Sequence, residues 1–279
     1  MHGPSQSPSA ATKVSALGLI RRPWRARLVG FFGAGLTVLA LLVSPIARAD
    51  TVRVAVASNF AKPARDLAKA FAAQSGHTAQ IALGSTGQLY AQIQNGAPFD
   101  VFLAADSRRP GLLVANGAAL ASSRFTYATG QLALWSADST LVDAQGEVLR
   151  HPPRNATRLA MANPKQAPYG VAAQQVLQHL GLAALWQAHT VMGENIAQTH
   201  QFVTSGNAQL GFVALSQVSS QGRFTAGSGW IVPGHTHDPI TQDAVLLTRA
   251  AQQPAALAWM AFLNSDAAAT IIRAAGYLR

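Results

Sequence analysis

The alternation of apolar runs with short polar turns constrains the fold of this chain most strongly. At four places, a run typical of a strand passes through a polar or glycine-containing turn into the start of a helix. The turns occupy residues 57–59, 84–87, 168–170 and 194–196. Repeated strand–turn–helix units pack as parallel strands with helices on the faces of the sheet, so the sequence predicts an α/β fold.

The same four turns predict a common binding site. They contain no lysine or arginine. The N-terminus of a helix presents unpaired N–H groups and the positive end of the helix dipole, and in α/β sheets ligands lie beyond the carboxyl ends of the strands. We therefore expect the turns to converge on a small anion and to bind it through neutral donors.

The first 49 residues have the composition of an export signal. A block of four arginines within residues 21–27 precedes an apolar run over residues 28–43, and Ala47 and Ala49 frame a small-x-small cleavage site. We expect cleavage before Asp50 and leave the export route open. The alternative is an uncleaved anchor, but the apolar run is shorter than the roughly 20 residues that span a bilayer.

Charge and cysteine content exclude several functional classes. The net charge is +10, but six of the 21 basic residues and none of the 11 acidic residues lie in the signal segment, so the remainder carries +4. Its arginines are scattered, which removes most of the case for nucleic acid. The chain has no cysteine and therefore no disulfide, thiolate metal site or cysteine nucleophile.

The predicted elements divide the rest of the chain into two α/β lobes. In the first part we expect strands at 51–57, 78–83 and 99–105, each followed by a helix, with Pro63 in a first helical turn and Gly76 as a helix stop. The second part predicts strands at 131–135, 158–161 and 210–214, and helices at 171–180 and up to Val203. A strand at 244–247 and helices at 255–263 and 267–274 return to the first lobe.

The domain prediction follows from this order. Residues 1–49 are the signal peptide, residues 50–130 with 239–279 form lobe 1, and residues 131–238 form lobe 2. The chain crosses between the lobes near Thr129 and near Asp238.

Several ordered motifs then resemble one family. The run GAPFDVFLAAD at residues 96–106, preceded by GSTGQL at 84–89 and AQI at 91–93, is similar to the periplasmic molybdate-binding proteins of ABC transporters. Residues 163–170, 194–196 and 210–213 match the same family in the same order. The resemblance extends from about Val52 to Leu278.

The resemblance implies a type II periplasmic binding fold, with a mostly parallel sheet in each lobe and the ligand in the cleft between lobes. It implies a monomeric periplasmic receptor that binds molybdate or tungstate, uses no cofactor and delivers the anion to a membrane permease and its ATPase. Carried onto this sequence, the contacts fall on side chains or backbone of six residues: Ser58, Asn59, Ser85, Thr86, Tyr169 and Ile196. For Tyr169 and Ile196 the implied donor is the backbone N–H group.

One position departs from the family pattern. Many members place a tyrosine hydroxyl on the anion where this chain has Ala214. We expect the side-chain amide of Asn59 to supply the lost donor, with Ser216 as the alternative.

Other interpretations of these residues remain open at this point. The serine, threonine and asparagine side chains could be ordinary helix caps, and sulfate or another oxyanion could be the ligand. An exported α/β enzyme is the competing class, but Ser-x-x-Lys and Gly-x-Ser-x-Gly are absent. The loop at residues 84–87 lacks the lysine of a phosphate loop. We expect His235, His237 and Asp238 to form a solvated loop rather than a zinc site, and Asp100 and Asp106 to be structural.

Overall fold

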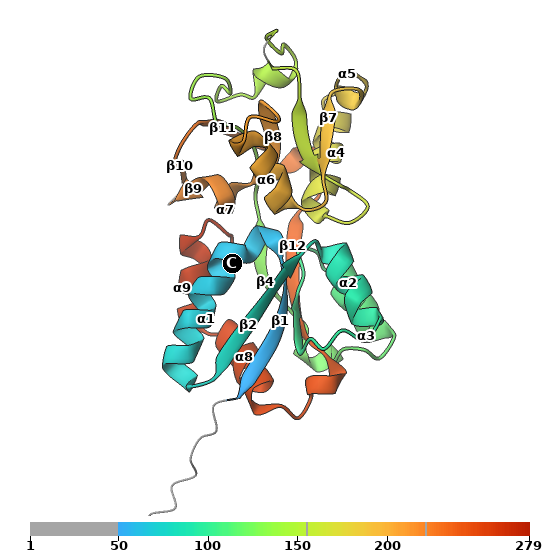
Figure 1. Cartoon of the computed structure of the whole chain (residues 1–279), viewed down its shortest axis with the longest axis vertical. Coiled ribbons are helices and arrows are strands. Elements are labelled where there is room, and N and C mark those ends of the chain that lie inside the picture. The colour runs from blue at the N-terminus through green and yellow to red at the C-terminus, as the bar shows by residue number, and fades with distance from the viewer. Residues whose placement is uncertain (1–49, 155, 221) are drawn as a thin grey trace, which may run out of the picture. The chain divides into compact units, whose positions relative to one another are not determined.

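The computed structural model describes residues 50–154, 156–220 and 222–279. The predicted signal segment at 1–49 lies outside these residues. The described chain forms two five-stranded sheets, each flanked by helices (Figure 1).

The first sheet has the strand order β2-β1-β3-β12-β4. Its strands are β1 (Thr51–Ala57), β2 (Thr78–Gly84), β3 (Val101–Leu103), β4 (Phe125–Gly130) and β12 (Ile240–Leu246). The helices that pack on it are α1 (Ala61–Ser75), α2 (Thr86–Gln94), α3 (Arg108–Ala115), α8 (Pro254–Leu263) and α9 (Asp266–Ala274). Helices α1, α8 and α9 contact one another, whereas α2 and α3 pack together in a separate apolar cluster.

The second sheet has the strand order β11-β5-β8-β6-β7. Its strands are β5 (Leu132–Ser136), β6 (Leu159–Ala162), β7 (Thr190–Gly193), β8 (Leu210–Ala214) and β11 (Ser228–Ile231). Its helices are α4 (Pro168–His179), α5 (Ala183–Gln187), α6 (Ile196–Thr204) and α7 (Leu215–Val218). A small hairpin of β9 (Ser219–Ser220) and β10 (Arg223–Phe224) follows α7.

The predicted two-lobed α/β class is confirmed, but both sheets are mixed rather than mostly parallel. Strand β1 pairs in parallel with β2 and β3, whereas β12 is antiparallel to β3 and β4. In the second sheet β6 is parallel to β7 and β8, whereas β5 is antiparallel to β8 and β11. The reason is the crossing: β4 leads the chain out of the first sheet and β12 brings it back, so the two strands run in opposite directions.

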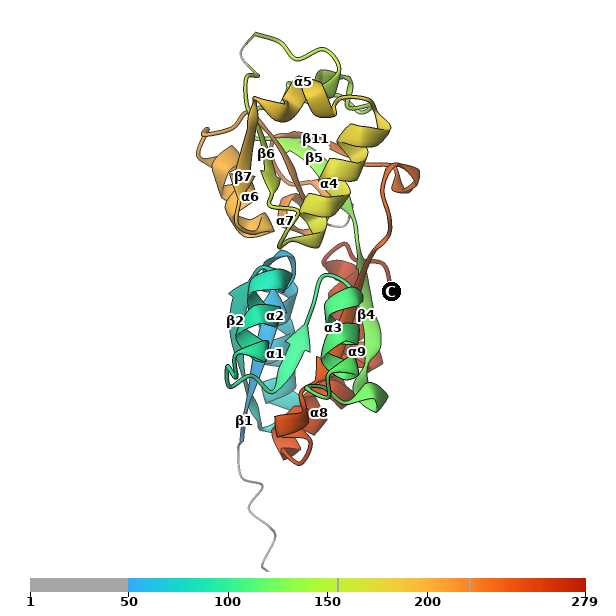
Figure 2. The same cartoon turned by 90° about the vertical axis from the view of Figure 1, so that its right-hand side faces the viewer.

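Every strand of the first sheet lies within residues 50–130 or 239–279, and every strand of the second lies within 131–238. Figures 1 and 2 show β4 and β12 side by side where the chain passes between the sheets. Whether these two parts move as rigid lobes with those boundaries stays a prediction.

Local sequence explains where the helices begin and end. Helix α1 buries Ala64, Leu67 and Phe71 on one face, as its periodicity predicts, and ends at Gly76, whose φ of 72° is costly for other residues. Among the described residues, no single helix is long and apolar enough to cross a membrane. Helices α8 and α9 reach that length and composition only as a pair, which is bent by 61°.

Candidate functional site

The four predicted turns meet at one small cavity. All six predicted residues line it, and its volume is about 10 Å³. The complete lining is Ala57, Ser58, Asn59, Gly84, Ser85, Thr86, Ala105, Ala167, Pro168, Tyr169 and Ile196. Both parts of the chain therefore contribute residues to one small, partly open cavity.

Strand register brings the two turns of the first sheet together. Strands β1 and β2 are parallel neighbours, with Ala57 opposite Gly84. The chain leaves β1 into a short 3₁₀ helix, η2 (Ser58–Phe60), and leaves β2 into α2. Because both turns follow the carboxyl ends of paired strands, they lie at the same edge of the sheet.

At the start of α2, three of the first four N–H groups already have partners. The Gly87 N–H donates to Gln166 O at 2.9 Å, Gln88 N–H to Ser85 Oγ at 3.3 Å and Leu89 N–H to Ser85 O at 3.0 Å. The remaining N–H, that of Thr86, donates to no atom of the described residues. It is the one donor that this helix start leaves for a ligand.

The start of α6 has the same pattern. The side chain of Asn195 accepts hydrogen bonds from Ala197 N–H and Gln198 N–H, both at 3.0 Å, and the Thr199 N–H donates to Asn195 O at 3.1 Å. Within the described chain this leaves the Ile196 N–H without an acceptor. The N-cap therefore occupies every early donor except the one that borders the cavity.

Helix α4 leaves the third such donor. Pro168 has no N–H, and the N–H groups of Gly170 and Val171 both donate to Ala167 O, at 2.9 and 3.2 Å. Of the first N–H groups of this helix, that of Tyr169 alone has no acceptor among the residues that the structure describes. Proline at the first helical position thus removes a competing donor beside the site.

The hydroxyl groups at the cavity differ in what they contact. Ser85 Oγ caps α2 in a capping box with Gln88 and lies 3.4 Å from Gln166 Oε1, so the expected capping role is real. Thr86 Oγ1 accepts a hydrogen bond from Ala105 N–H at 3.1 Å, and its own proton has no acceptor in the described structure. No hydrogen bond of the Ser58 hydroxyl is found there either, although Ser58 is buried. Thr86 and Ser58 therefore each have a proton to donate.

The side chain of Asn59 does not behave as predicted. Its Nδ2 donates to Gln242 Oε1 at 2.9 Å and to Tyr277 Oη at 3.0 Å, so both amide protons are in use. The alternative residue, Ser216, does not line the cavity; its Oγ lies 3.3 Å from Asn59 O and 2.9 Å from Tyr277 Oη. The side-chain amide of Asn59 can donate to an anion only if one of these bonds breaks. What Asn59 can offer a ligand without such a change is its backbone in η2.

The phenol groups behind the cavity are neutral. Burial raises the pKa of Tyr277 to about 12 and raises those of Tyr127 and Tyr169 well above their usual range. Tyr127 Oη donates to Gln242 Oε1 at 3.0 Å, and Gln242 Nε2 donates to Tyr169 Oη at 3.4 Å. The surroundings of the cavity are therefore polar but carry no charge on these side chains.

The two aspartates near the site are paired with arginine side chains. Asp106 forms an ion pair with Arg109 and accepts the Arg109 N–H at 2.8 Å, while Asp100 accepts the Arg53 N–H at 2.8 Å and contacts Arg249 at 3.3 Å. Both aspartates hold backbone at strand or helix ends, as predicted. Among the described residues no three acidic, histidine or cysteine side chains form a possible metal site.

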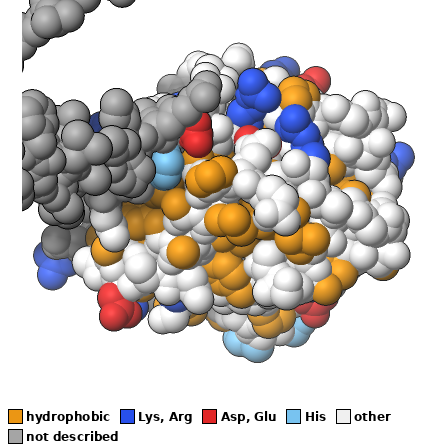
Figure 3. All heavy atoms as spheres, turned by 90° about the horizontal axis from the view of Figure 1, so that it is seen from below, with side chains coloured by type: hydrophobic (Ala, Val, Ile, Leu, Met, Phe, Trp, Pro, Cys, Tyr) orange, Lys and Arg blue, Asp and Glu red, His pale blue; other side chains and the backbone are white. Residues whose placement is uncertain are grey.

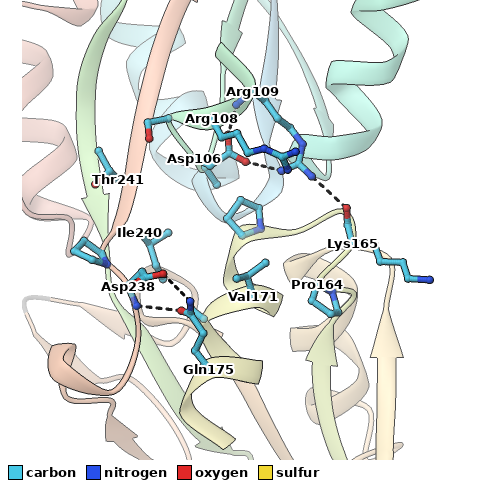
Figure 4. Close-up of a pocket in the computed structure, with 15 residues that line it drawn as sticks. Asp106, Arg108, Arg109, Pro164, Lys165, Val171, Gln175, Asp238, Ile240 and Thr241 are labelled. Atoms are coloured by element: carbon cyan, nitrogen blue, oxygen red, sulfur yellow. Dashed lines mark hydrogen bonds and ion pairs between the residues drawn. The ribbon is translucent and has the colours of Figure 1, made fainter. Parts of the chain in front are cut away.

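A wider groove of about 470 Å³ adjoins the cavity, and Ala105 and Pro168 line both. Figure 4 shows the hydrogen bonds along its walls, of which the one between Arg109 and Lys165 joins elements of the two sheets. Arg109 Nη2 donates to Lys165 O at 3.2 Å, and Gln175 exchanges two hydrogen bonds with Asp238, at 2.7 and 3.0 Å. Arg108 and Lys165 also line this groove, outside the neutral cavity.

Figure 3 shows one face of the molecule, where hydrophobic side chains gather in the middle and lysine and arginine side chains stand toward the rim. The part of this face that is described is not the continuous basic surface that nucleic-acid binding requires.

The comparisons with known proteins place this geometry in a family. The sequence pattern of the bacterial extracellular solute-binding proteins matches residues 52–278. The chain belongs to this family. The two relatives described next are binding proteins, in agreement with the class expected from the sequence.

Within the solute-binding family, the chain is similar to relatives that are named as molybdate-binding proteins. The chain is 51% identical to the molybdate-binding protein ModA of Azotobacter vinelandii over 90% of its own length and 97% of the relative. It is 45% identical to ModA of Rhodobacter capsulatus, over 88% and 96% of the two chains. Its fold matches the solved periplasmic molybdate-binding protein of Azotobacter vinelandii with a TM-score of 0.77 and 43% identity, over 82% of this chain and 99% of that one. The family resemblance drawn from the sequence is confirmed.

The sequence did not reveal the polar groups behind the cavity. Gln242 and Tyr277 accept hydrogen bonds from Asn59, and Tyr127 donates to Gln242, yet Gln242 is 183 positions and Tyr277 218 positions away from Asn59. No short motif links residues at such separations. Gln242 lies in the polar run Thr241–Asp243 of β12, which does not distinguish it from its neighbours.

Proposed function

We propose that the protein is a periplasmic receptor that binds molybdate in the small cavity and delivers it to the permease and ATPase of a membrane ABC transporter. It acts as a monomer after removal of residues 1–49. The observation that carries the proposal is the donor set: the N–H groups of Thr86, Tyr169 and Ile196, each the one left unpaired at its helix start, border one uncharged cavity.

The donor set fits the chemistry of the anion. Molybdate is fully deprotonated near neutral pH, so it accepts hydrogen bonds and donates none. A cavity that presents only donors rejects a protonated phosphate, whose hydrogen would face another hydrogen. Tungstate has the same charge and shape, and we expect the same site to accept it. The identity of the Azotobacter and Rhodobacter relatives supports molybdate as the ligand.

The contacts divide between the two lobes. From residues 50–130 we assign the Ser58 hydroxyl, the backbone of Asn59 and the N–H and hydroxyl of Thr86, with Ser85 holding the start of α2. From residues 131–238 we assign the N–H groups of Tyr169 and Ile196. The present cavity of about 10 Å³ is about the size of one water molecule. A tetrahedral oxyanion therefore requires the lobes to part and close again around it.

The test is thermal unfolding with molybdate, tungstate, sulfate and phosphate, followed by calorimetric titration. A ligand that binds only the folded state at 100 times its dissociation constant stabilises that state by about 2.7 kcal/mol. For a chain of this size we expect the melting temperature to rise by about 5 to 10 °C with molybdate and tungstate.

Each anion in the series has a defined meaning. A rise with sulfate equal to that with molybdate would assign the protein to oxyanions in general. An unchanged melting curve with all four anions would contradict the receptor proposal. Chloride at the same ionic strength serves as the control for screening effects.

A further inference from the structure

Behind the cavity, a cluster of buried polar side chains connects the two lobes. We propose that Tyr277 and Ser216 are positioning residues for the anion site: their hydroxyl groups tie η2 of lobe 1 to α7 of lobe 2 and thereby set how fast a bound oxyanion is released. The proposal rests on the function proposed above. It assigns roles to two residues that do not contact the ligand.

Tyr277 is the centre of the cluster. Its hydroxyl accepts a hydrogen bond from Asn59 Nδ2 at 3.0 Å and lies 2.8 Å from Asn59 O and 2.9 Å from Ser216 Oγ. The residue is buried and its ring packs edge-on against Phe60, with the ring centroids 5.1 Å apart. Both the side chain and the carbonyl of Asn59 are therefore held by one hydroxyl.

Counting protons shows that neither hydroxyl is left for the anion. In one arrangement Ser216 donates to Tyr277 and Tyr277 donates to Asn59 O. In the other, Tyr277 donates to Ser216, which donates to Asn59 O at 3.3 Å. Each arrangement uses both protons and ends on the same carbonyl. Because this carbonyl belongs to η2, its anchoring fixes the direction of the η2 peptide groups beside the cavity.

The Ser216 bonds cross between the lobes. Asn59 and Tyr277 belong to the part of the chain that forms the first sheet, and Ser216 lies on α7, which follows β8 of the second sheet. Helix α7 contacts η2 directly. Hydrogen bonds of this kind exist only while the lobes are together, so they stabilise the closed state and slow its opening. Their partly buried location strengthens them relative to bonds in open solvent.

The contact lies close to the position where the chain lacks the tyrosine of other family members. Ala214 cannot donate a side-chain hydrogen bond, and it lies two positions before Ser216. A tyrosine hydroxyl is nevertheless present beside α7, but it comes from the C-terminal segment. That segment is itself fixed to β4, because Thr129 and Leu278 exchange backbone hydrogen bonds at 2.8 and 3.0 Å.

The experiment measures release of radiolabelled molybdate from the exported protein during a chase with excess unlabelled molybdate. We compare the wild type with Ser216→Ala, Tyr277→Phe and the double variant. Loss of one or two net hydrogen bonds predicts release that is about tenfold faster, with association changed less than about twofold. The double variant should be no faster than Tyr277→Phe alone, because both hydroxyls act in one contact.

Two variants control for the loss of a hydroxyl as such. Ser219→Ala removes a hydroxyl that bonds to Leu215 O at 2.8 Å within the second lobe, and Tyr90→Phe removes one on α2 that does not contact the cluster. Both should release molybdate at the wild-type rate. A purely structural role for Tyr277 would lower the melting temperature without changing the release rate.

A second measurement does not depend on the anion. In ligand-free protein, hydrogen exchange at η2 and at α7 should accelerate together in Ser216→Ala, which changes a partly buried side chain and is the variant least disruptive to folding. Release rates within about twofold of wild type, or additive effects in the double variant, would overturn the proposal. If the wild type retains no radiolabelled molybdate, both the proposed receptor function and the proposed role in release are contradicted. Hydrogen-exchange rates would still show whether the interlobe contact forms.

Discussion

At the scale of single residues, two hydroxyl groups of the same cavity differ in their hydrogen bonds within the protein. Thr86 Oγ1 accepts the Ala105 N–H, so it supports the structure as well as facing the cavity. Ser58 Oγ has no hydrogen-bond partner among the described residues, although its residue is only 6% exposed. Ser58 Oγ is not one of the fully buried unpaired polar atoms of the described residues, so it keeps access to the cavity, where a ligand or water can accept its proton.

This difference predicts separable effects. Ser58→Ala should weaken molybdate binding about tenfold or more, because a charge-assisted hydrogen bond contributes roughly 1.5 to 3 kcal/mol, and should leave the stability of the ligand-free protein unchanged. Thr86→Val should lower both the molybdate affinity and the stability of the ligand-free protein, since the Ala105 N–H also loses its acceptor. Calorimetry gives the affinities and urea unfolding gives the stabilities. Thr86→Ser, which keeps the hydroxyl, is the matched control, and equal stability losses in Ser58→Ala and Thr86→Val would contradict the assignment.

At the scale of elements, the site consists of helix starts with their capping completed around one free donor. Helices α2, α4 and α6 each use a side chain, a proline or a backbone carbonyl to occupy the early N–H groups. This arrangement converts ordinary helix N-termini into a set of single, directed donors. The capping interpretation is confirmed for Ser85, whereas the binding interpretation of the same turns stays a prediction.

Asn195→Ala tests this relation between cap and site. Loss of the N-cap of α6 should cost about 1 kcal/mol of stability, and molybdate affinity should fall as well, because the Ile196 N–H is no longer held in place. Thermal unfolding and calorimetry measure the two effects.

The matched control for this cap is Ser265→Ala. Ser265 caps α9 by accepting the Ala268 N–H at 3.3 Å, away from the cavity. Ser265→Ala should therefore lose a similar amount of stability and bind molybdate with unchanged affinity. A drop in affinity with both variants would mean that global stability, rather than the local helix start, controls binding.

At the scale of the whole molecule, a network of neutral hydrogen bonds lies where the two sheets meet, in addition to the contact of Arg109 with Lys165 O. Asn59, Gln242, Tyr127, Tyr169 and Tyr277 form a connected network where β4, β12 and the C-terminal segment lie beside elements of the second sheet. The network depends on phenols that keep their protons. Its contribution should therefore be insensitive to salt and sensitive to alkaline pH.

The pH dependence has a definite sign. Burial raises the pKa of Tyr277 to about 12, whereas an unfolded tyrosine titrates near pH 10. Between these values the unfolded chain loses a proton that the folded protein keeps, so the free energy of unfolding falls as pH rises from about 10 to about 12. Below pH 10 this contribution is fully present. Urea unfolding against pH measures the fall, and Tyr277→Phe should show a shallower one; identical profiles would contradict the role of Tyr277.

Much of the fold was predictable because it depends on local chemistry. Apolar runs, Pro63 and Gly76 placed the strands and helix ends of the first sheet within a few residues, and the four polar turns identified the edge where the cavity lies. The strand at Phe125–Gly130 was missed, and the sheets were expected to be mostly parallel. Periodicity reports burial, whereas strand direction depends on where the chain crosses between sheets.

The sequence by itself determined where the four polar turns lie and that helices begin at or near them, because capping and proline placement act over three or four adjacent residues. The N–H groups of Tyr169 and Ile196 came from the family resemblance, and their contact with a ligand stays a prediction. Only the tertiary structure decided the use of the Asn59 amide, which the resemblance had directed to the anion and which instead bonds to Gln242 and Tyr277. A side chain with two protons gives them to whichever acceptors the folded chain brings nearest, and here those acceptors come from segments about two hundred positions away.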